Sequence, residues 1–204
     1  MSASPQRIEE MLRDVGISPV AGVDEAGRGP CAGPLIIASV ILDDPFADTW
    51  REIRDSKEIS EKKREVLFDV VMENAAAVSV IEVSPEEIDL RGVHAANLGG
   101  MRRAVNGLSI TPAYVLTDGY AIEGLAVPNL AVWKGDQVTI SIGAASIIAK
   151  VTRDRIMREM DALYPGYGFA GHKGYITAAH TAAIQERGVL PIHRKSFSNI
   201  AALL

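Results

Sequence analysis

Residues 20–30 read Val-Ala-Gly-Val-Asp-Glu-Ala-Gly-Arg-Gly-Pro, an apolar run that ends in two acidic side chains and a glycine-rich turn. The apolar residues predict a strand, and the glycines predict backbone that bends or lies against a ligand. Asp24 and Glu25 would repel each other and be costly to bury. A divalent cation would offset that cost, because Mg²⁺ and Mn²⁺ prefer oxygen ligands. Since Arg28 suits a phosphate, the stretch points to a phosphodiester handled with metal ions.

The sequence around this stretch predicts an α/β fold in one domain, residues 1–204, because no segment resembles a linker. Ser60, Ser84 and Thr177 are expected to cap helices, and Pro85 fits the first turn of the second one. Strands are expected at 20–25, 33–42, 77–83, 114–117 and 131–133, the first two as a hairpin. Helices are expected at 60–76, from 84 onward, at 95–106, 141–163 and 177–188, with a loop at 164–174.

Composition narrows the class of protein. The chain has 204 residues, of which 48% are hydrophobic, so it can bury a sizeable core. Cys31 is the only cysteine, which excludes an intrachain disulfide and a cysteine-rich zinc site. Residues 1–13 are polar and lack the apolar core of a signal peptide. No run approaches the roughly 20 apolar residues of a membrane span. We therefore expect a soluble cytoplasmic protein without a membrane partner.

The net charge of −5 is unevenly distributed. Residues 1–136 carry a net charge of −9, whereas residues 137–204 carry eight Lys/Arg and four Asp/Glu, a net charge of +4. A basic C-terminal third can hold phosphates near an acidic metal site. Chance scatter of charges over a surface is the alternative.

Four carboxylates share one sequence context. Asp24, Glu25, Asp118 and Asp136 each lie at or just beyond the end of an apolar, strand-like run. Sites in α/β sheets are assembled at such strand ends. Two divalent ions held there would clamp the attacking water and the leaving oxygen of a phosphodiester. Taken alone, Asp118-Gly119 and Gly135-Asp136 are equally typical of ordinary turns.

Several other residues have two interpretations. Asp154 forms an i,i+4 ion pair with Lys150 on a solvated helix face, or it is an acid near the metal site. The nearby arginines of this helix, Arg153, Arg155 and Arg158, either meet phosphates or are only solvated. Ser56 and Lys57 can hold a phosphate, and His172 and His193 can assist binding. Trp50 and Trp133 fit packing better than base stacking.

Two other functions compete with a metal-dependent nuclease. A nucleotide-dependent phosphotransferase would carry a Gly-x-x-x-x-Gly-Lys-Ser/Thr loop or Gly-x-Gly-x-x-Gly, and neither occurs in the sequence. A non-catalytic module that binds structured RNA would not need four carboxylates at strand ends, since these repel phosphate unless metal is bound.

The chain resembles the type 2 ribonuclease H family, specifically bacterial ribonuclease HII. The matching motifs follow the family order over residues 20–198. They are Asp24-Glu25-Ala26-Gly27-Arg28-Gly29, Asp55-Ser56-Lys57, Asp118-Gly119, Lys134-Gly135-Asp136, the run from Gly143 to Asp154, His172-Lys173-Gly174-Tyr175 and Leu190-Pro191-Ile192-His193-Arg194. Type HIII relatives lack the Gly-Arg-Gly turn, so the resemblance favours HII.

The resemblance implies a ribonuclease H-like mixed β-sheet flanked by helices, with a C-terminal helical part. It implies an endoribonuclease that uses Mg²⁺ or Mn²⁺ to hydrolyse RNA in RNA–DNA hybrids and nicks 5′ of single ribonucleotides embedded in duplex DNA. By motif position, the catalytic and metal-binding residues are Asp24, Glu25, Asp118 and Asp136. The expected substrate-binding residues are Gly27, Arg28, Gly29, Ser56, Lys57, Lys173 and Tyr175, with Tyr175 as the junction sensor.

Overall fold

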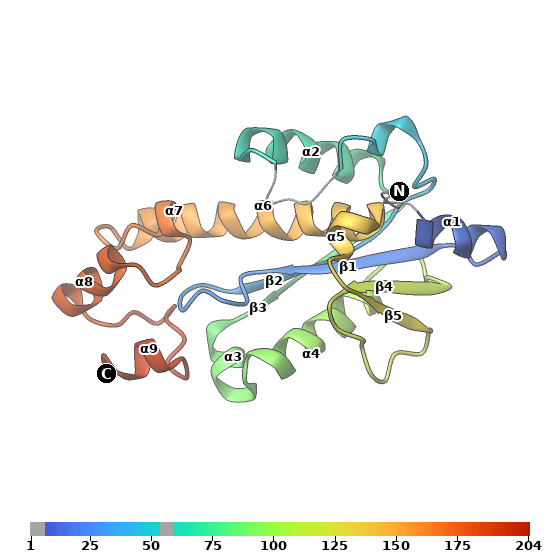
Figure 1. Ribbon diagram of the computed structural model, residues 1–204. Helices are drawn as coiled ribbons and strands as arrows, with labels where there is room; N and C mark the ends of the chain where they lie inside the picture. Colours follow the sequence, from blue (N-terminus) through green and yellow to red (C-terminus); the bar gives the residue numbers. More distant parts are fainter. Residues whose placement is uncertain (1–6, 54–58) are drawn as a thin grey trace.

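The acidic stretch forms the central strand of a mixed five-stranded sheet in the order β3-β2-β1-β4-β5 (Figure 1). The computed structural model describes residues 7–53 and 59–204. The strands are β1 (Val20–Ala26), β2 (Leu35–Ile41), β3 (Ala77–Val83), β4 (Tyr114–Asp118) and β5 (Asn129–Val132). The helices are α1 (Arg7–Asp14), α2 (Glu61–Asn74), α3 (Pro85–Arg91), α4 (Val93–Asn106), α5 (Gly135–Val138), α6 (Ile140–Leu163), α7 (Phe169–His172), α8 (Ala178–Arg187) and α9 (Ser198–Ala201).

Strand direction places the strand ends that matter at one edge. β1 runs antiparallel to β2, which confirms the predicted hairpin, and β2 runs antiparallel to β3. β1 runs parallel to β4, and β4 runs parallel to β5. The carboxyl ends of β1, β4 and β5 therefore meet on the same side of the sheet.

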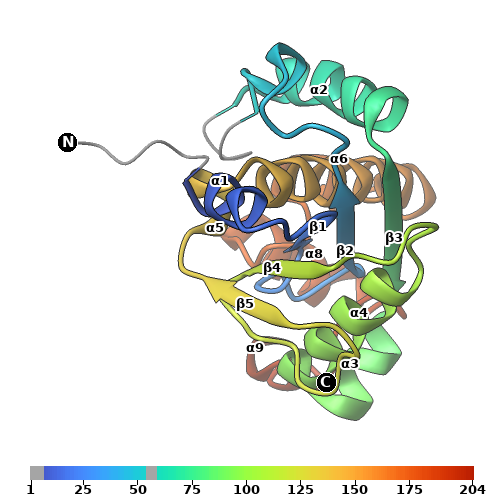
Figure 2. The same cartoon turned by 90° about the vertical axis from the view of Figure 1, so that its right-hand side faces the viewer.

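Helices cover both faces of the sheet, as Figure 2 shows with α6 and α2 on one side and α3 and α4 on the other. The alternation of side chains along β2 explains this arrangement. Ile36, Ala38 and Val40 join the core under α6 and α2, whereas Leu35 and Ile37 join the core under α4. Both faces of the strand are buried, so its sequence reads as a continuous apolar run.

The long helix α6 lies close against β1 because Gly22 has no side chain. A Cβ atom on Gly22 would lie 2.1 Å from the backbone carbon of Ser141. The small residues Gly143-Ala144-Ala145-Ser146 are all buried along the same helix. The prediction that this segment packs closely on the sheet is confirmed.

The start of α6 is capped from outside the helix. Glu9 of α1 is 2% exposed and accepts hydrogen bonds from the backbone N–H groups of Ile140 at 2.9 Å and Ser141 at 3.0 Å. Burial raises the pKa of Glu9, and these hydrogen bonds oppose the shift. A carboxylate at this position satisfies orphan N–H groups and complements the helix dipole.

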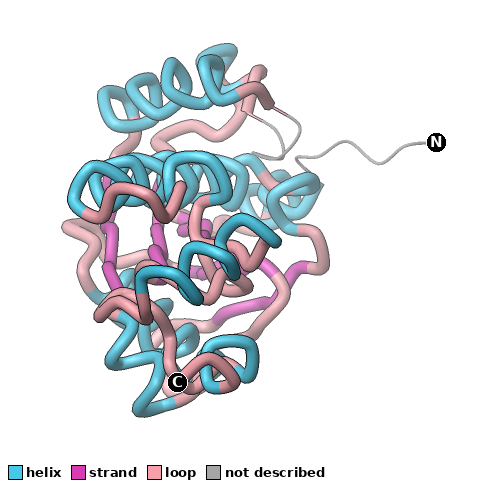
Figure 3. The backbone as a smooth tube through the Cα atoms, turned by 90° about the vertical axis from the view of Figure 1, so that its left-hand side faces the viewer, coloured by secondary structure: helices cyan, strands magenta, loops and turns pink. Residues whose placement is uncertain are grey.

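The C-terminal part forms a separate helical layer at one end of the sheet, seen in front in Figure 3. Residues 164–174 were expected to be a loop, but Phe169 begins the short helix α7 and its ring is fully buried. Ser60, Ser84 and Thr177 cap their helices as predicted. Among the described residues, none of the helices combines the length and apolarity needed to cross a membrane.

Candidate functional site

Three of the predicted carboxylates meet where β1 and β4 end. Val23 is paired with Thr117 in the parallel register, so the next residues, Asp24 and Asp118, leave the sheet side by side. Glu25 follows Asp24, and its N–H donates a hydrogen bond of 2.7 Å to the Asp24 carboxylate. The predicted convergence of these strand ends is therefore what the fold produces.

Asp24 lies in the most strongly perturbed position of the group. It is 5% exposed, and its pKa is raised well above the ordinary value by burial, by the charge of Glu25 and by the charge of Asp118. Hydrogen bonds from Ser146 and from the Glu25 N–H oppose the shift. A buried carboxylate crowded by two like charges is stabilised when a cation joins the site.

Asp136 reaches the site from α5, one turn after β5. It is 5% exposed. The loop before it is tied to the other carboxylates, because the Gly135 N–H donates a 2.7 Å hydrogen bond to Asp118 Oδ1. The strand β5 ends at Val132, so the predicted strand 131–133 is one residue too long.

The carboxylates line two adjoining hollows. The first, of about 330 Å³, is called the tyrosine hollow; it is lined by Asp24, Glu25, Ala26, Gly27, Arg28, Gly29, Asp118, Ser146, Lys150, Arg153 and Tyr175. The second, of about 380 Å³, is called the tryptophan hollow; it is lined by Glu25, Arg28, Asp118, Gly119, Tyr120, Trp133, Lys134, Asp136 and Gln137. Glu25, Arg28 and Asp118 belong to both hollows, so the acidic group lies where they meet.

The donor chemistry of this group fits a divalent metal ion. Carboxylate oxygens are the ligands that Mg²⁺ and Mn²⁺ prefer, and the like charges around Asp24 give a reason for a cation to bind. In the described ranges, however, no three His, Cys, Asp or Glu side chains are already arranged to hold an ion. Metal binding here would require the carboxylates to turn toward a common point.

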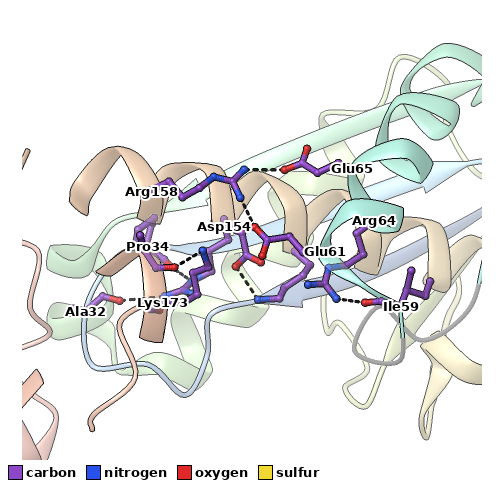
Figure 4. Close-up of polar contacts among 12 residues, drawn as sticks. Ala32, Pro34, Ile59, Glu61, Arg64, Glu65, Asp154, Arg158 and Lys173 are labelled. Atoms are coloured by element: carbon purple, nitrogen blue, oxygen red, sulfur yellow. Dashed lines mark hydrogen bonds and ion pairs between the residues drawn. The ribbon is translucent and has the colours of Figure 1, made fainter. Parts of the chain in front are cut away.

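The Gly-Arg-Gly turn is held from beneath by two buried arginines. Arg194 donates to the carbonyls of Gly27 at 2.7 Å and Arg28 at 3.2 Å. Arg153 donates to the carbonyls of Pro34, Ala32 and Lys173, which are labelled in Figure 4, at 3.0, 3.1 and 2.9 Å.

These arginines are charged structural anchors. Burial is the main cause that lowers the pKa of Arg153 to about 10 and that of Arg194 to about 9, so both carry a charge at neutral pH. Gly27 is required above Arg153, because its φ is 100° and an added Cβ would lie 2.0 Å from the Arg153 Nε. The interpretation of Arg153 as a phosphate contact or a solvated charge is wrong, since the residue is 2% exposed.

Arg28 itself lies above the turn, between the two hollows. Its guanidinium carbon is 4.3 Å from the centre of the Tyr120 ring, a cation–π contact. The His94 ring packs against the other side chain of this pair, with a 5.2 Å distance between its centroid and that of Tyr120. This support aims a positive charge at the place where the carboxylates gather.

Tyr175 lies next to Gly29, as the motif resemblance requires if the two act together. It is 53% exposed, and a Cβ on Gly29 would lie 3.5 Å from its ring carbon Cε1. The loop before it is docked on the glycine-rich segment, because the Cys31 N–H donates to the Gly174 carbonyl at 3.0 Å. The Lys173 ammonium instead donates to the Ala170 carbonyl at 2.7 Å within its own loop.

A chain of histidines supports the Tyr175 loop, and sequence reasoning missed it. The Leu190 N–H donates to His193 Nδ1 at 2.8 Å, so the other nitrogen of that ring carries the proton. His193 Nε2 then donates to His180 Nε2 at 3.1 Å. His180 Nδ1 donates in turn to the Tyr175 carbonyl at 2.9 Å. The hydrogen-bond pattern thus assigns both rings as neutral, and burial lowers the pKa of each.

The basic C-terminal third is mostly engaged inside the protein. Lys150 donates to Asp154 at 2.7 Å, which confirms the i,i+4 pair, but Asp154 is 3% exposed and the expected solvated face is wrong. Arg155 and Arg158 pair with glutamates of α2, including the Glu61 and Glu65 shown in Figure 4. Scatter of free charge over the surface is therefore not the explanation of this basic segment.

The remaining predicted residues divide clearly. Trp50 is 3% exposed and packs in the core, as predicted, whereas Trp133 is 82% exposed. His172 and His193 belong to the histidine cluster under the Tyr175 loop rather than to the acidic site. Ser56 and Lys57 lie outside the described residues.

Comparisons with known proteins agree on one family. The family model described as Ribonuclease HII matches residues 21–200. Ribonuclease HII of Mycobacterium avium is 52% identical over 199 residues, covering 98% of this chain and 86% of that protein. The crystal structure of ribonuclease H2 from Pyrococcus horikoshii OT3 superposes with a TM-score of 0.79 at 29% identity, covering 90% of this chain and 96% of that one.

A more distant structure shares the fold alone. The Bst ribonuclease HIII, solved in complex with Mn²⁺, superposes with a TM-score of 0.68 at 17% identity and covers 94% of this chain and 70% of that one. The mixed sheet flanked by helices is thus the fold expected from the sequence.

Proposed function

Since the chain belongs to the ribonuclease HII family of endonucleases that act on RNA in RNA–DNA hybrids, we propose that it also nicks duplex DNA on the 5′ side of single embedded ribonucleotides, with divalent metal ions at Asp24, Glu25, Asp118 and Asp136. One observation carries the proposal. The acidic group lies where two hollows meet, with Arg28 on one side and Tyr175 at the far wall. An anionic strand can enter such a site only where cations offset the carboxylates.

The four carboxylates would hold the metal ions, Mg²⁺ or Mn²⁺. When bound, such ions supply an activated water and stabilise the charge on the leaving oxygen of the phosphodiester. Ser146 keeps Asp24 oriented through its hydrogen bond. The Gly135 N–H does the same for Asp118. These contacts hold the ligands in place without adding positive side chains that would compete for them.

Substrate recognition falls to the glycine-rich turn and the Tyr175 loop. The Arg28 guanidinium provides a charge for a backbone phosphate. The exposed Tyr175 ring can pack on a sugar, and its hydroxyl can reach the 2′-hydroxyl that distinguishes RNA from DNA. Because Gly29 lies directly beside that ring, the backbone of the turn can approach the same nucleotide.

The direct experiment compares three labelled duplexes of one sequence: an RNA–DNA hybrid, a DNA duplex with one ribonucleotide, and an all-DNA duplex. We expect cleavage of the first, a single nick 5′ of the ribonucleotide in the second, and no cleavage of the third. Mg²⁺ or Mn²⁺ should be required, and EDTA should abolish cleavage.

Other results would favour other functions. Binding of the hybrid without cleavage in any divalent metal would support a non-catalytic RNA-binding module. Hydrolysis of a nucleoside triphosphate without nicking would support a phosphotransferase. Cleavage of the hybrid without a nick at a lone ribonucleotide would confine the activity to hybrids and overturn the finer part of the proposal.

A further inference from the structure

The most exposed aromatic side chain near the site is Trp133. It is 82% exposed, while the other tryptophan, Trp50, is 3% exposed. The fold does not need Trp133, because β5 ends at Val132 and the ring packs in none of the apolar clusters of the described residues. A large apolar ring kept in water beside a binding hollow points to a ligand.

Its surroundings have the chemistry of a nucleotide site. Trp133 lines the tryptophan hollow of about 380 Å³ together with Lys134 and Arg28. Lys134 has a φ of 53°, a left-handed conformation that is costly for a residue with a side chain. The chain therefore presents an aromatic ring and an ammonium group next to each other at the rim of the hollow.

The two hollows give a direction for a bound strand. Tyr175 lines the first hollow and Trp133 the second, and they share only Glu25, Arg28 and Asp118. A strand whose scissile phosphate lies over the shared carboxylates would contact Tyr175 on one side and Trp133 on the other. One nucleotide spans about 6–7 Å of an extended strand, so neighbouring nucleotides reach both hollows.

We propose that Trp133, with Lys134, forms a second nucleotide subsite, in which the indole ring packs on the nucleotide across the scissile phosphate from the one at Tyr175. This inference rests on the proposed function. The ring supplies the stacking surface and Lys134 supplies a cation for the adjacent phosphate. Base–aromatic stacking tolerates any sequence, because every base has a π-face, which suits an enzyme that recognises sugars rather than bases.

The wild-type protein reports on this subsite without any mutation. Trp50 is buried, so acrylamide quenching of tryptophan fluorescence reports mainly on Trp133. We expect a hybrid duplex, added in Ca²⁺ with intact substrate checked on a gel, to reduce quenching at least about twofold. Trp50→Phe should keep this protection, and Trp133→Phe should remove the quenchable signal.

Kinetics provide the second readout. Trp133→Ala should weaken duplex binding roughly ten-fold and raise KM to match, with kcat at saturation changed less than about threefold. Trp133→Phe should keep most of the affinity. Leu130→Ala is the matched control, because Leu130 is a 45% exposed apolar residue on β5 that lines neither hollow; it should bind the duplex as the wild type does.

Failure of this inference differs from failure of the proposed function. If the wild type cleaves the hybrid but the duplex leaves Trp133 quenching unchanged, the subsite is wrong and the nuclease assignment stands. Quenching that falls with protein concentration alone would mean that a second copy covers Trp133, which also overturns the subsite. A wild type that cleaves neither substrate overturns the proposed function itself.

Discussion

Arg153 and Arg194 show how a side chain's role depends on what it contacts. Both belong to a basic segment that would suit phosphate binding. In the fold they donate to backbone carbonyls that lie between 20 and 167 residues away in the chain. Buried charges of this kind are tolerated only when fully hydrogen-bonded, so their function is to shape the Gly-Arg-Gly turn.

Tyr175 gives the sharpest prediction for a single side chain. Tyr175→Ala should lower cleavage at a lone ribonucleotide roughly ten-fold or more, because a stacking contact is worth about 1–3 kcal/mol. Since the ring is 53% exposed, thermal stability should change little. Tyr175→Phe should keep more activity, because the ring remains.

Rates of nicking and thermal melting curves separate the outcomes for Tyr175. Wild-type cleavage by Tyr175→Ala would exclude the junction-sensing role. Unfolding of that variant would show that the ring instead supports the loop.

The contact between β1 and α6 is the element on which the site depends, since Asp24 lies on one and Ser146 on the other. Most of the fold at this level was predictable from residue patterns. The hairpin, the strand at 77–83 and the caps at Ser60, Ser84 and Thr177 all follow from local signals. The Glu9 cap of α6 did not, because its hydrogen bonds join residues 131 and 132 positions apart.

Gly22→Ala should test this contact. The new methyl group would lie 2.1 Å from the backbone carbon of Ser141, so strand and helix must separate. Overpacking of this kind costs about 3 kcal/mol or more, measured as a lower midpoint in urea unfolding. Gly99→Ala is the matched control in α4, where an added Cβ meets no atom within 4 Å; it should leave stability equal or higher by about 0.5–1 kcal/mol. Equal effects of the two changes would contradict the close approach.

The histidine chain that links the last helices to the Tyr175 loop predicts a pH dependence. His193 has a pKa of about 4 in the fold, lowered first by burial and then by His180, against 6.5 in the unfolded chain. Between pH 6.5 and 4 the unfolded state therefore binds more protons, and the free energy of unfolding falls as pH drops, by a total on the order of 3 kcal/mol.

Urea unfolding of the wild type and His193→Asn between pH 8 and 4 measures this effect. The variant pays a constant cost for its lost contacts at every pH, so only the change in the difference matters. We expect the two stabilities to converge as pH falls below 6.5. Parallel curves would show that His193 is not a neutral buried ring.

The molecule as a whole places an acidic centre in a chain of net charge −5. How far the site was predictable depends on what each residue contacts. The meeting of Asp24, Glu25 and Asp118 follows from strand ends in a parallel pair. The exposure of Trp133 and the histidine chain depend on tertiary packing that no spacing encodes. That a single domain spans residues 1–204 remains a prediction.

Salt dependence of duplex binding tests the charge distribution. Because most cations of residues 137–204 are paired internally, few remain to meet phosphates. We expect affinity to fall with salt, with log Kd against log salt giving about two to four phosphate contacts at roughly 0.9 per contact. Fluorescence anisotropy with a labelled hybrid measures it. A flat dependence would mean no phosphate contacts, and a slope near eight would mean that the paired arginines bind the duplex after all.

Metal-dependent cleavage through Asp118 is tested most directly by nicking of a single-ribonucleotide duplex with Asp118→Asn across a Mg²⁺ titration. The amide can still accept the hydrogen bond from the Gly135 N–H, so circular dichroism should show an unchanged fold. Losing the charge that holds the ion should lower the rate at least about a hundredfold, about 2.7 kcal/mol, while Asp154→Asn loses far less. Near-normal turnover of Asp118→Asn in saturating Mg²⁺ would contradict the assignment of this carboxylate as a metal ligand.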